Sequence, residues 1–385
     1  MGTLSFLGFA VISFGGPLAL AGLIAPGVIA GAGSGAGGSA GLALLIATVV
    51  FAVPLLIWLR YAREVHGSGG LYDFVRAAAG PQVAFAQAAI WALSYLLYIV
   101  YTTEQIVYYL LPNVFTGVQS LQTLLALLIP VVLCAVMVGG RRVALITAGL
   151  LAVTQLALVG VLDGVTIASF GFPASSFGAA APAGGLAKAG FQSSLLYVCG
   201  SLPLFLGGEL ARPAVTIRRG LSATYLLTAL VVVLAVAPLA GAPAFLGAGV
   251  SGVAVAQRFV GTGLADALGI GIALSIGGVM LAEYFALTRL VHAVTSWRLR
   301  PVTLVIAVFV LAAAPLMLIN PDGLYSALIQ PSLVALWLSQ VIVFAVYPRF
   351  AQRRGQRLLP ACALSLTASG LAIYGLVITL QQATS

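Results

Sequence analysis

Long apolar stretches make up most of the chain, and short polar stretches separate them. A helix needs about 20 apolar residues to cross about 30 Å of hydrocarbon, so stretches of that length predict membrane spans. The pattern predicts eleven spans, at approximately 4–30, 41–60, 82–111, 120–139, 143–163, 190–210, 221–241, 263–291, 301–319, 323–347 and 359–380. Two longer Gly/Pro/Ser-rich loops are expected near 164–189 and 242–262, and no separate soluble domain fits between the spans.

The composition also predicts a membrane protein. Hydrophobic residues make up 62% of the 385 residues and charged residues only 6%, with a mean hydropathy of +1.15. Charged residues are about 25% of an ordinary soluble domain. A water-soluble globule cannot bury this much apolar surface, and a disordered chain would be far more polar. The expected fold is therefore all-α and polytopic, embedded in the lipid bilayer.

Basic residues predict the orientation of the spans. The net charge of +9 would suggest nucleic acid as a partner of a soluble protein, but here the basic residues lie in short loops and report orientation. A cytoplasmic N-terminus leaves only Lys188 and Arg258 outside, as the positive-inside rule requires. The first span has no basic segment before it and is expected to be retained, and eleven spans place the C-terminus outside. The basic residues expected inside are Arg60, Arg63, Arg76, Arg141, Arg142, Arg212, Arg218, Arg219, Arg289, Arg298, Arg300, Arg349, Arg353, Arg354 and Arg357.

Two spans carry glycine and proline near mid-membrane. Proline removes a helical N–H and glycine lets the backbone unwind, so each site predicts either a packing kink or a functional break. Backbone groups freed by a break cannot face lipid and must be buried in protein or line a wet cavity. The candidate substrate-binding residues at these sites are Ser13, Phe14, Gly15, Gly16 and Pro17 in span one, and Cys199, Gly200, Ser201 and Leu202, followed by Pro203, in span six.

The spacing of the two sites predicts an inverted repeat. Spans one and six stand five apart, so a repeat of spans one to five would be inserted upside down, and paired breaks in inverted halves mark the central site of transporters. The expected repeats are approximately 1–165 and 188–348, with an additional helix at 359–380, in one transmembrane domain. Pro17 suits the first position of an outer half-helix, whose free amides can hold a carboxylate. Freed carbonyls can accept an ammonium group, so one site matches both ends of an α-amino acid.

Three loop motifs resemble the amino acid–polyamine–organocation (APC) permeases. His-Gly-Ser-Gly-Gly-Leu-Tyr at 66–72, with Ala-Gly-Pro at 79–81, looks like their loop between spans two and three. Glu-Leu-Ala-Arg-Pro at 209–213 is similar to the end of their sixth span, and Arg-Leu-Val-His-Ala at 289–293 resembles the end of their eighth. The resemblance implies a five-plus-five inverted-repeat fold, alternating access, and amino acids or related amines as substrates. The chain differs from many members in having eleven spans, Cys-Gly-Ser at the sixth-span break and no lysine in span five.

Polar side chains at helical spacing mark span three. Ser94, Tyr98, Tyr101, Glu104 and Tyr108 are expected to share one face. One interpretation is an aromatic packing stripe with Glu104 near the outer interface. The functional interpretation has Tyr98 or Tyr101 closing over substrate through a cation–π contact, with Glu104 as an outer gate or proton acceptor.

Span eight adds two polar candidates. Glu283 lies about two turns beyond Ser275 on broadly the same face, and an ionisable residue at this depth is costly and usually functional. Glu283 is interpreted either as a proton carrier or as a partner of a cytoplasmic-side arginine such as Arg289. Ser275 is either a sodium ligand beside span-one carbonyls or a helix-contact serine. Glu209 is expected to pair with a loop arginine, and Asp163 is expected to be solvated at the outer face.

The leading hypothesis is a secondary active transporter of amino acids or small organic amines in a bacterial cell membrane. Coupling to protons, coupling to sodium and exchange all stay open, with protons favoured by the buried acids. The alternatives are an intramembrane enzyme, a channel or a transport-dead sensor. The glycine-rich stretch 33–41 matches the glycine spacing of a dinucleotide-binding loop and the Gly-x-Ser-x-Gly motif of a nucleophile elbow. It lacks the preceding strand that both motifs need and the His and Asp partners of a catalytic serine. No catalytic residue, cofactor or metal is predicted, the three scattered cysteines fit no disulfide or zinc framework, and the oligomeric state is not predicted.

Overall fold

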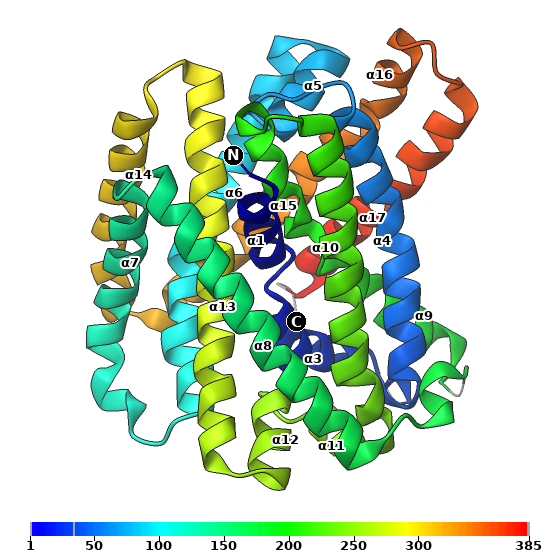
Figure 1. Cartoon of the computed structure of the whole chain (residues 1–385), viewed down its shortest axis with the longest axis vertical. Helices are drawn as coiled ribbons and strands as arrows, with labels where there is room; N and C mark the ends of the chain where they lie inside the picture. Colours follow the sequence, from blue (N-terminus) through cyan, green and yellow to red (C-terminus); the bar gives the residue numbers. More distant parts are fainter. Residues whose placement is uncertain (1, 34, 180, 383–385) are drawn as a thin grey trace.

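The chain folds into a bundle of membrane-length helices (Figure 1). A computed structural model describes residues 2–33, 35–179 and 181–382, and these contain helices but no strand. Among the described residues, eleven helical stretches are long and apolar enough to cross a membrane, which confirms the predicted number. They are Thr3–Gly31, Ala36–Ala62, Pro81–Asn113, Val118–Val138, Arg141–Phe170, Ala183–Glu209, Pro213–Gly241, Thr262–Thr295, Leu299–Leu318, Pro321–Arg353 and Leu358–Gln381.

Several spans combine α-helix with a short 3-10 or π segment, labelled η. The first half of the chain contains α1 (Thr3–Ser13), α2 (Pro17–Ala19), η1 (Leu20–Ile24), α3 (Ala25–Gly31), η2 (Ala36–Ser39), α4 (Ala40–Ala62), α5 (Leu71–Ala79), α6 (Pro81–Glu104), η3 (Gln105–Leu110), η4 (Leu111–Asn113), η5 (Val118–Leu121), α7 (Gln122–Val138) and α8 (Arg141–Phe170). The second half contains η6 (Ala174–Phe177), α9 (Ala183–Leu195), η7 (Val198–Glu209), α10 (Pro213–Val236), η8 (Ala237–Gly241), α11 (Pro243–Leu246), α12 (Ser251–Phe259), α13 (Thr262–Thr295), α14 (Leu299–Ala313), η9 (Ala314–Leu318), α15 (Pro321–Ala345), α16 (Tyr347–Arg353) and α17 (Leu358–Gln382).

Three predicted boundaries were wrong, one of them the start of span six, which lies at Ala183 instead of near 190. Span five continues to Phe170 instead of ending at Asp163, because one aspartate and one glycine do not interrupt an otherwise apolar helix. The segment 242–262, predicted as a loop, contains α11 and α12. The apolar side chains of α12 pack against α8 and α13, so tertiary contacts stabilise a short helix there.

The broken first span lies at the centre of the bundle. Its first helix, α1, packs against α8, α10, α13 and η7. At the crossing with α8, a Cβ added to Gly8 would lie 3.0 Å from the Cα of Gly149, so the two backbones touch. Such close approach between small residues is how helices associate in a membrane, where no hydrophobic effect drives them together.

The two ends of the bundle differ in charge. In Figure 1, α5, α16 and the start of α1 lie at one end, and α11 and α12 lie at the other. The first end holds most of the arginine-rich connections, whereas Arg258 belongs to α12 at the opposite end. We call these the arginine-rich end and the opposite end; their assignment as cytoplasmic and outer stays a prediction.

The glycine-rich loop before α5 packs onto η7, the second half of span six. Gly70 has a φ of +55°, and a Cβ there would lie 2.7 Å from the Phe205 ring of η7. The Asp73 carboxylate closes this loop by accepting a hydrogen bond from the Gly69 N–H at 2.8 Å. Burial raises the pKa of Asp73 above its usual value, against the opposing effects of that hydrogen bond and of Arg76.

Replacing Asp73 by Ala is expected to destabilise the protein by about 1 kcal/mol, because the Gly69 N–H loses its acceptor. Asp73→Asn keeps an acceptor and removes a half-buried charge, so it is expected to be at least as stable as the native protein at neutral pH. A raised folded-state pKa means that the folded state binds the proton more tightly. The native protein should therefore gain stability relative to Asp73→Asn as the pH falls towards the unfolded pKa. Thermal unfolding midpoints of the three proteins, measured from neutral pH down to the unfolded pKa of aspartate, test these expectations. Equal midpoints for Asp73→Ala and Asp73→Asn would contradict the role of residue 73 as the acceptor for the Gly69 N–H.

Candidate functional site

The break in span one follows α1 directly. Gly15 and Gly16 have φ angles of +79° and +68°, which favour glycine, and Pro17 begins the next helical turn as predicted. The backbone N–H of Leu20 donates to the Gly16 carbonyl at 2.9 Å, so winding resumes within one turn. The Ser13 hydroxyl donates back to the Phe9 carbonyl at 2.7 Å and stabilises the end of α1.

The break in span six lies earlier than the sequence predicts. The α-helix ends at Leu195, and the chain continues as the 3-10 segment η7 from Val198. Cys199, Gly200, Ser201 and Leu202 therefore lie within this tighter helix and not in an unwound loop. Pro203 cannot supply a helical N–H, and the 3-10 pattern tolerates it without an open gap.

The two breaks contact each other. A Cβ added to Gly200 would lie 2.2 Å from the Phe14 ring, so this ring lies directly on the backbone of η7. Phe14 is fully buried and also packs on Tyr225 of α10, with ring centroids 5.8 Å apart. On the other side, a Cβ on Gly15 would lie 3.2 Å from the Leu196 carbonyl oxygen. In this structure the space between the breaks is thus filled by Phe14.

Span eight closes the site from a third side. The Ala19 N–H donates to the Ser275 hydroxyl oxygen at 3.2 Å, and Ser275 in turn donates to Oε1 of Gln155 at 2.8 Å. A Cβ on Gly16 would lie 2.3 Å from Ser275 Oγ. Ser275 and Gln155 are both buried, so this chain of hydrogen bonds links spans one, five and eight inside the bundle.

A thiol and a carboxyl meet beside the broken helix. Cys199 Sγ donates to Oε1 of Glu283 at 3.8 Å. Glu283 is fully buried, and its Oε2 has no hydrogen-bond partner among the described residues. Arg289 pairs with Glu209 instead, so the alternative that Glu283 is an ion-pair partner of Arg289 is wrong.

The tyrosines of span three lie next to this pair. Tyr98 and Tyr101 contact each other edge to face with ring centroids 5.2 Å apart, and Tyr95 continues the row towards the middle of the membrane. Glu283 is close enough to all three hydroxyl groups for electrostatic interaction. The stripe is therefore both packed and adjacent to the buried acid.

Glu104 lies in a separate place. It is fully buried at the end of α6, and neither carboxylate oxygen has a hydrogen-bond partner among the described residues. Its charged neighbour is Asp322 of α15, which accepts a hydrogen bond from the Tyr109 hydroxyl at 2.6 Å. The two coupling candidates, Glu104 and Glu283, thus belong to different clusters. Asp163, predicted to be solvated, is only 6% exposed because span five continues past it.

The arginine-rich end is closed by an ionic cluster. Glu209, at the end of η7, pairs with Arg289 of α13 at 3.0 Å and with Arg141 of α8 at 3.3 Å, which confirms that it pairs with arginine. The opposite end is more open. A cavity of about 960 Å³ there is lined by span one, α9, α15 and α17, and it reaches Leu196 beside the break.

Solved structures of the same shape match nearly the whole chain. MhsT in complex with L-phenylalanine matches with a TM-score of 0.63 and 14% identity, over 98% of this chain and 98% of that one. A manganese transporter of Eremococcus coleocola, in complex with an aromatic bis-isothiourea substituted compound, gives 0.61 and 13% over 98% and 87%. A point mutant of that transporter gives the same values. No family model and no curated protein matches the sequence.

The chain has the LeuT fold. Its broken first and sixth helices and its five-plus-five inverted repeat agree with the sequence prediction. The solved neighbours include a transporter, and none of the comparisons shows the APC family, so that narrower assignment and the repeat boundaries stay predictions.

Sequence reasoning missed two contributors to this site. Gln155 was identifiable only as a lone amide in an apolar span, and its contact with Ser275 needs the tertiary fold. Tyr95 lies one turn from Tyr98 but was not singled out. Within the described ranges there is no group of three or more His, Cys, Asp or Glu residues that could hold a metal ion.

Proposed function

We propose that the protein is a secondary transporter of amino acids or small organic amines that works by alternating access. The observation that carries this proposal is the contact between the two broken helices, with the buried carboxyl of Glu283 beside Cys199 of the second, inside a LeuT fold. The substrate would occupy the place now filled by the Phe14 ring, between the breaks, with Tyr98 and Tyr101 beside its ammonium group.

The closed and open ends support an alternating-access cycle. The ionic cluster of Glu209, Arg289 and Arg141 ties η7, α13 and α8 together at the arginine-rich end. The cavity at the opposite end stops at Leu196. The structure is therefore accessible from one end down to the break and sealed beyond it. Rotation of Phe14 would admit substrate, and separation of the ionic cluster would release it.

We infer that protons drive the cycle through Glu283. A buried carboxyl without a second partner is costly in a membrane and is kept for function. Ser275, the sodium-site candidate, supports this inference, because its hydroxyl already accepts from Ala19 and donates to Gln155. Glu104, beside Asp322, would act separately at the opposite end of the pathway.

Uptake by proteoliposomes tests the proposal. A thermal-shift screen over amino acids and amines, with Mn²⁺ as a further arm, would identify the ligand, because a ligand that binds only the folded state raises its stability. The radiolabelled ligand should then accumulate in response to an inward proton gradient. Binding without flux would indicate a sensor, a non-saturating current would indicate a channel, and a shift with Mn²⁺ alone would replace the organic substrate by a metal ion.

A further inference from the structure

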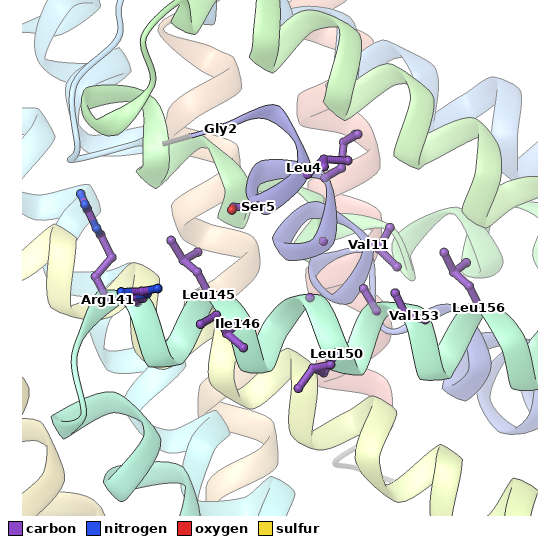
Figure 2. A pocket seen from close by; sticks show the side chains of 15 residues that line it. Gly2, Leu4, Ser5, Val11, Arg141, Leu145, Ile146, Leu150, Val153 and Leu156 are labelled. Atoms are coloured by element: carbon purple, nitrogen blue, oxygen red, sulfur yellow. The ribbon is translucent and has the colours of Figure 1, made fainter.

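A groove of about 840 Å³ lies on the outside of the bundle between α1 and α8, away from the contact between the breaks. It is lined along α8 by Leu145, Ile146, Leu150, Val153 and Leu156 (Figure 2). Leu4 and Val11 line it from α1. Val153 is 69% exposed and Leu150 is 66% exposed, and both belong to a membrane span, so the groove faces the bilayer.

The groove is long enough to cross one leaflet. It follows α8 from Arg141 to Leu156, which at 1.5 Å per residue is about 22 Å. Half of the hydrocarbon core is about 15 Å thick. The groove therefore begins at the level of the lipid headgroups and crosses the whole hydrocarbon layer of that leaflet, as an acyl chain does.

The headgroup end of the groove is positively charged. Arg141 and Arg142 line this end, and Arg142 makes no ion pair or hydrogen bond among the described residues. Arg141 and Arg289 share the carboxylate of Glu209, and with the nearby Arg142 these four side chains carry a net charge of +2. The side chain of Arg141 is 59% exposed and can reach a further anion.

We propose that this groove binds an anionic phospholipid, with one acyl chain between α1 and α8 and the phosphate between Arg141 and Arg142. The apolar groove fits an acyl chain, and the net positive charge at its headgroup end attracts an anionic headgroup. A zwitterionic or neutral lipid would complement this charge less well. A bound lipid would hold α1 against α8. Because the break at Gly15 and Gly16 separates α1 from the rest of span one, the lipid would act on this half of the span alone. Lipid composition would thereby bias the position of α1.

Native mass spectrometry of the detergent-purified full chain tests the charge at the groove. Phosphatidylglycerol adducts should form at lower lipid concentration than phosphatidylcholine adducts, and Arg142→Gln should weaken phosphatidylglycerol binding about fivefold. Arg357→Gln, an exposed arginine at the start of α17, removes the same charge elsewhere and should leave binding unchanged. Equal binding of the two lipids, or an equal loss in both variants, overturns the proposal.

A second pair of variants tests the apolar part. Val153→Trp should fill the groove and reduce phosphatidylglycerol binding, whereas Val308→Trp on α14, at a similarly exposed position (67%), should not. Neither side chain is packed inside the protein, so both variants are expected to fold. If Val153→Trp leaves lipid binding intact but changes the oligomeric state, the groove is a contact between copies. If glycerol phosphate displaces the lipid completely, the site binds a free anion; either result overturns the proposal.

Discussion

Glu283→Gln is expected to reduce proton-driven uptake in proteoliposomes to the level of protein-free vesicles. Glutamine has the same size and keeps an acceptor for Cys199 Sγ, which lies 3.8 Å from Glu283 Oε1. It cannot take up or release a proton. The variant should therefore fold, bind the ligand in a thermal-shift assay and exchange it between labelled and unlabelled pools, while losing accumulation against a gradient.

A matched change at the surface controls for the loss of a carboxylate. Glu64→Gln removes an acid that pairs with Arg354 at 3.3 Å, where both side chains are partly exposed. Exposed pairs contribute about 0–1 kcal/mol, so this variant should transport normally. Full proton-driven uptake by Glu283→Gln would show that Glu283 does not couple transport. If Glu283→Gln loses both ligand binding and uptake, Glu283 is a binding residue and not the coupling group.

Gly16→Ala is expected to lower the free energy of unfolding by about 3 kcal/mol and to abolish transport. Gly16 has a φ of +68°, which costs an L-residue about 1–2 kcal/mol. Its added Cβ would lie 2.3 Å from Ser275 Oγ and 2.9 Å from the Ser275 carbonyl oxygen. Overpacking of this kind costs about 1–3 kcal/mol, and here it would separate span one from span eight.

Two other glycines divide this effect into its parts. Gly117 has a φ of +83° with open space around it, so Gly117→Ala carries the backbone cost alone, about 1–2 kcal/mol. Gly160 lies within α8, also in open space, and Gly160→Ala should be neutral or stabilising by up to about 1 kcal/mol. Thermal unfolding midpoints in detergent should be highest for Gly160→Ala, lower for Gly117→Ala and lowest for Gly16→Ala. A Gly16→Ala midpoint equal to that of Gly117→Ala would contradict the close contact with Ser275.

The break in span one shows what local sequence can predict. Two glycines followed by a proline cannot continue an α-helix, whatever surrounds them, and the chain unwinds at Gly15 and Gly16 with Pro17 at the next helical turn. The break in span six shows the limit. Glycine and proline near Cys199 predict an interruption, but its form depends on neighbours, and packing against α1 and α10 leaves a 3-10 helix instead of a loop.

The buried polar residues show the same limit. Glu209 was identifiable as an arginine partner because acids at span ends meet basic loops. The sequence did not say which arginine pairs with Glu209, and it left a pairing of Arg289 with Glu283 open because these two residues lie about two turns apart on one helix. Only the fold assigns Arg289 to Glu209. The pairing of Cys199 with Glu283 joins residues 84 positions apart and has no local signal.

The amino-acid sequence by itself determined the number of membrane-length helices in the described part of the chain, where the first span breaks, and that its halves repeat. These features follow from hydrocarbon thickness and from backbone chemistry, which act over one or two helical turns. Only the tertiary structure decided that Phe14 fills the space between the breaks, that Gln155 and Ser275 tie three spans together, and that Glu283 stands beside Cys199. Those contacts join helices that are distant along the chain, and the shapes of the packed side chains select them.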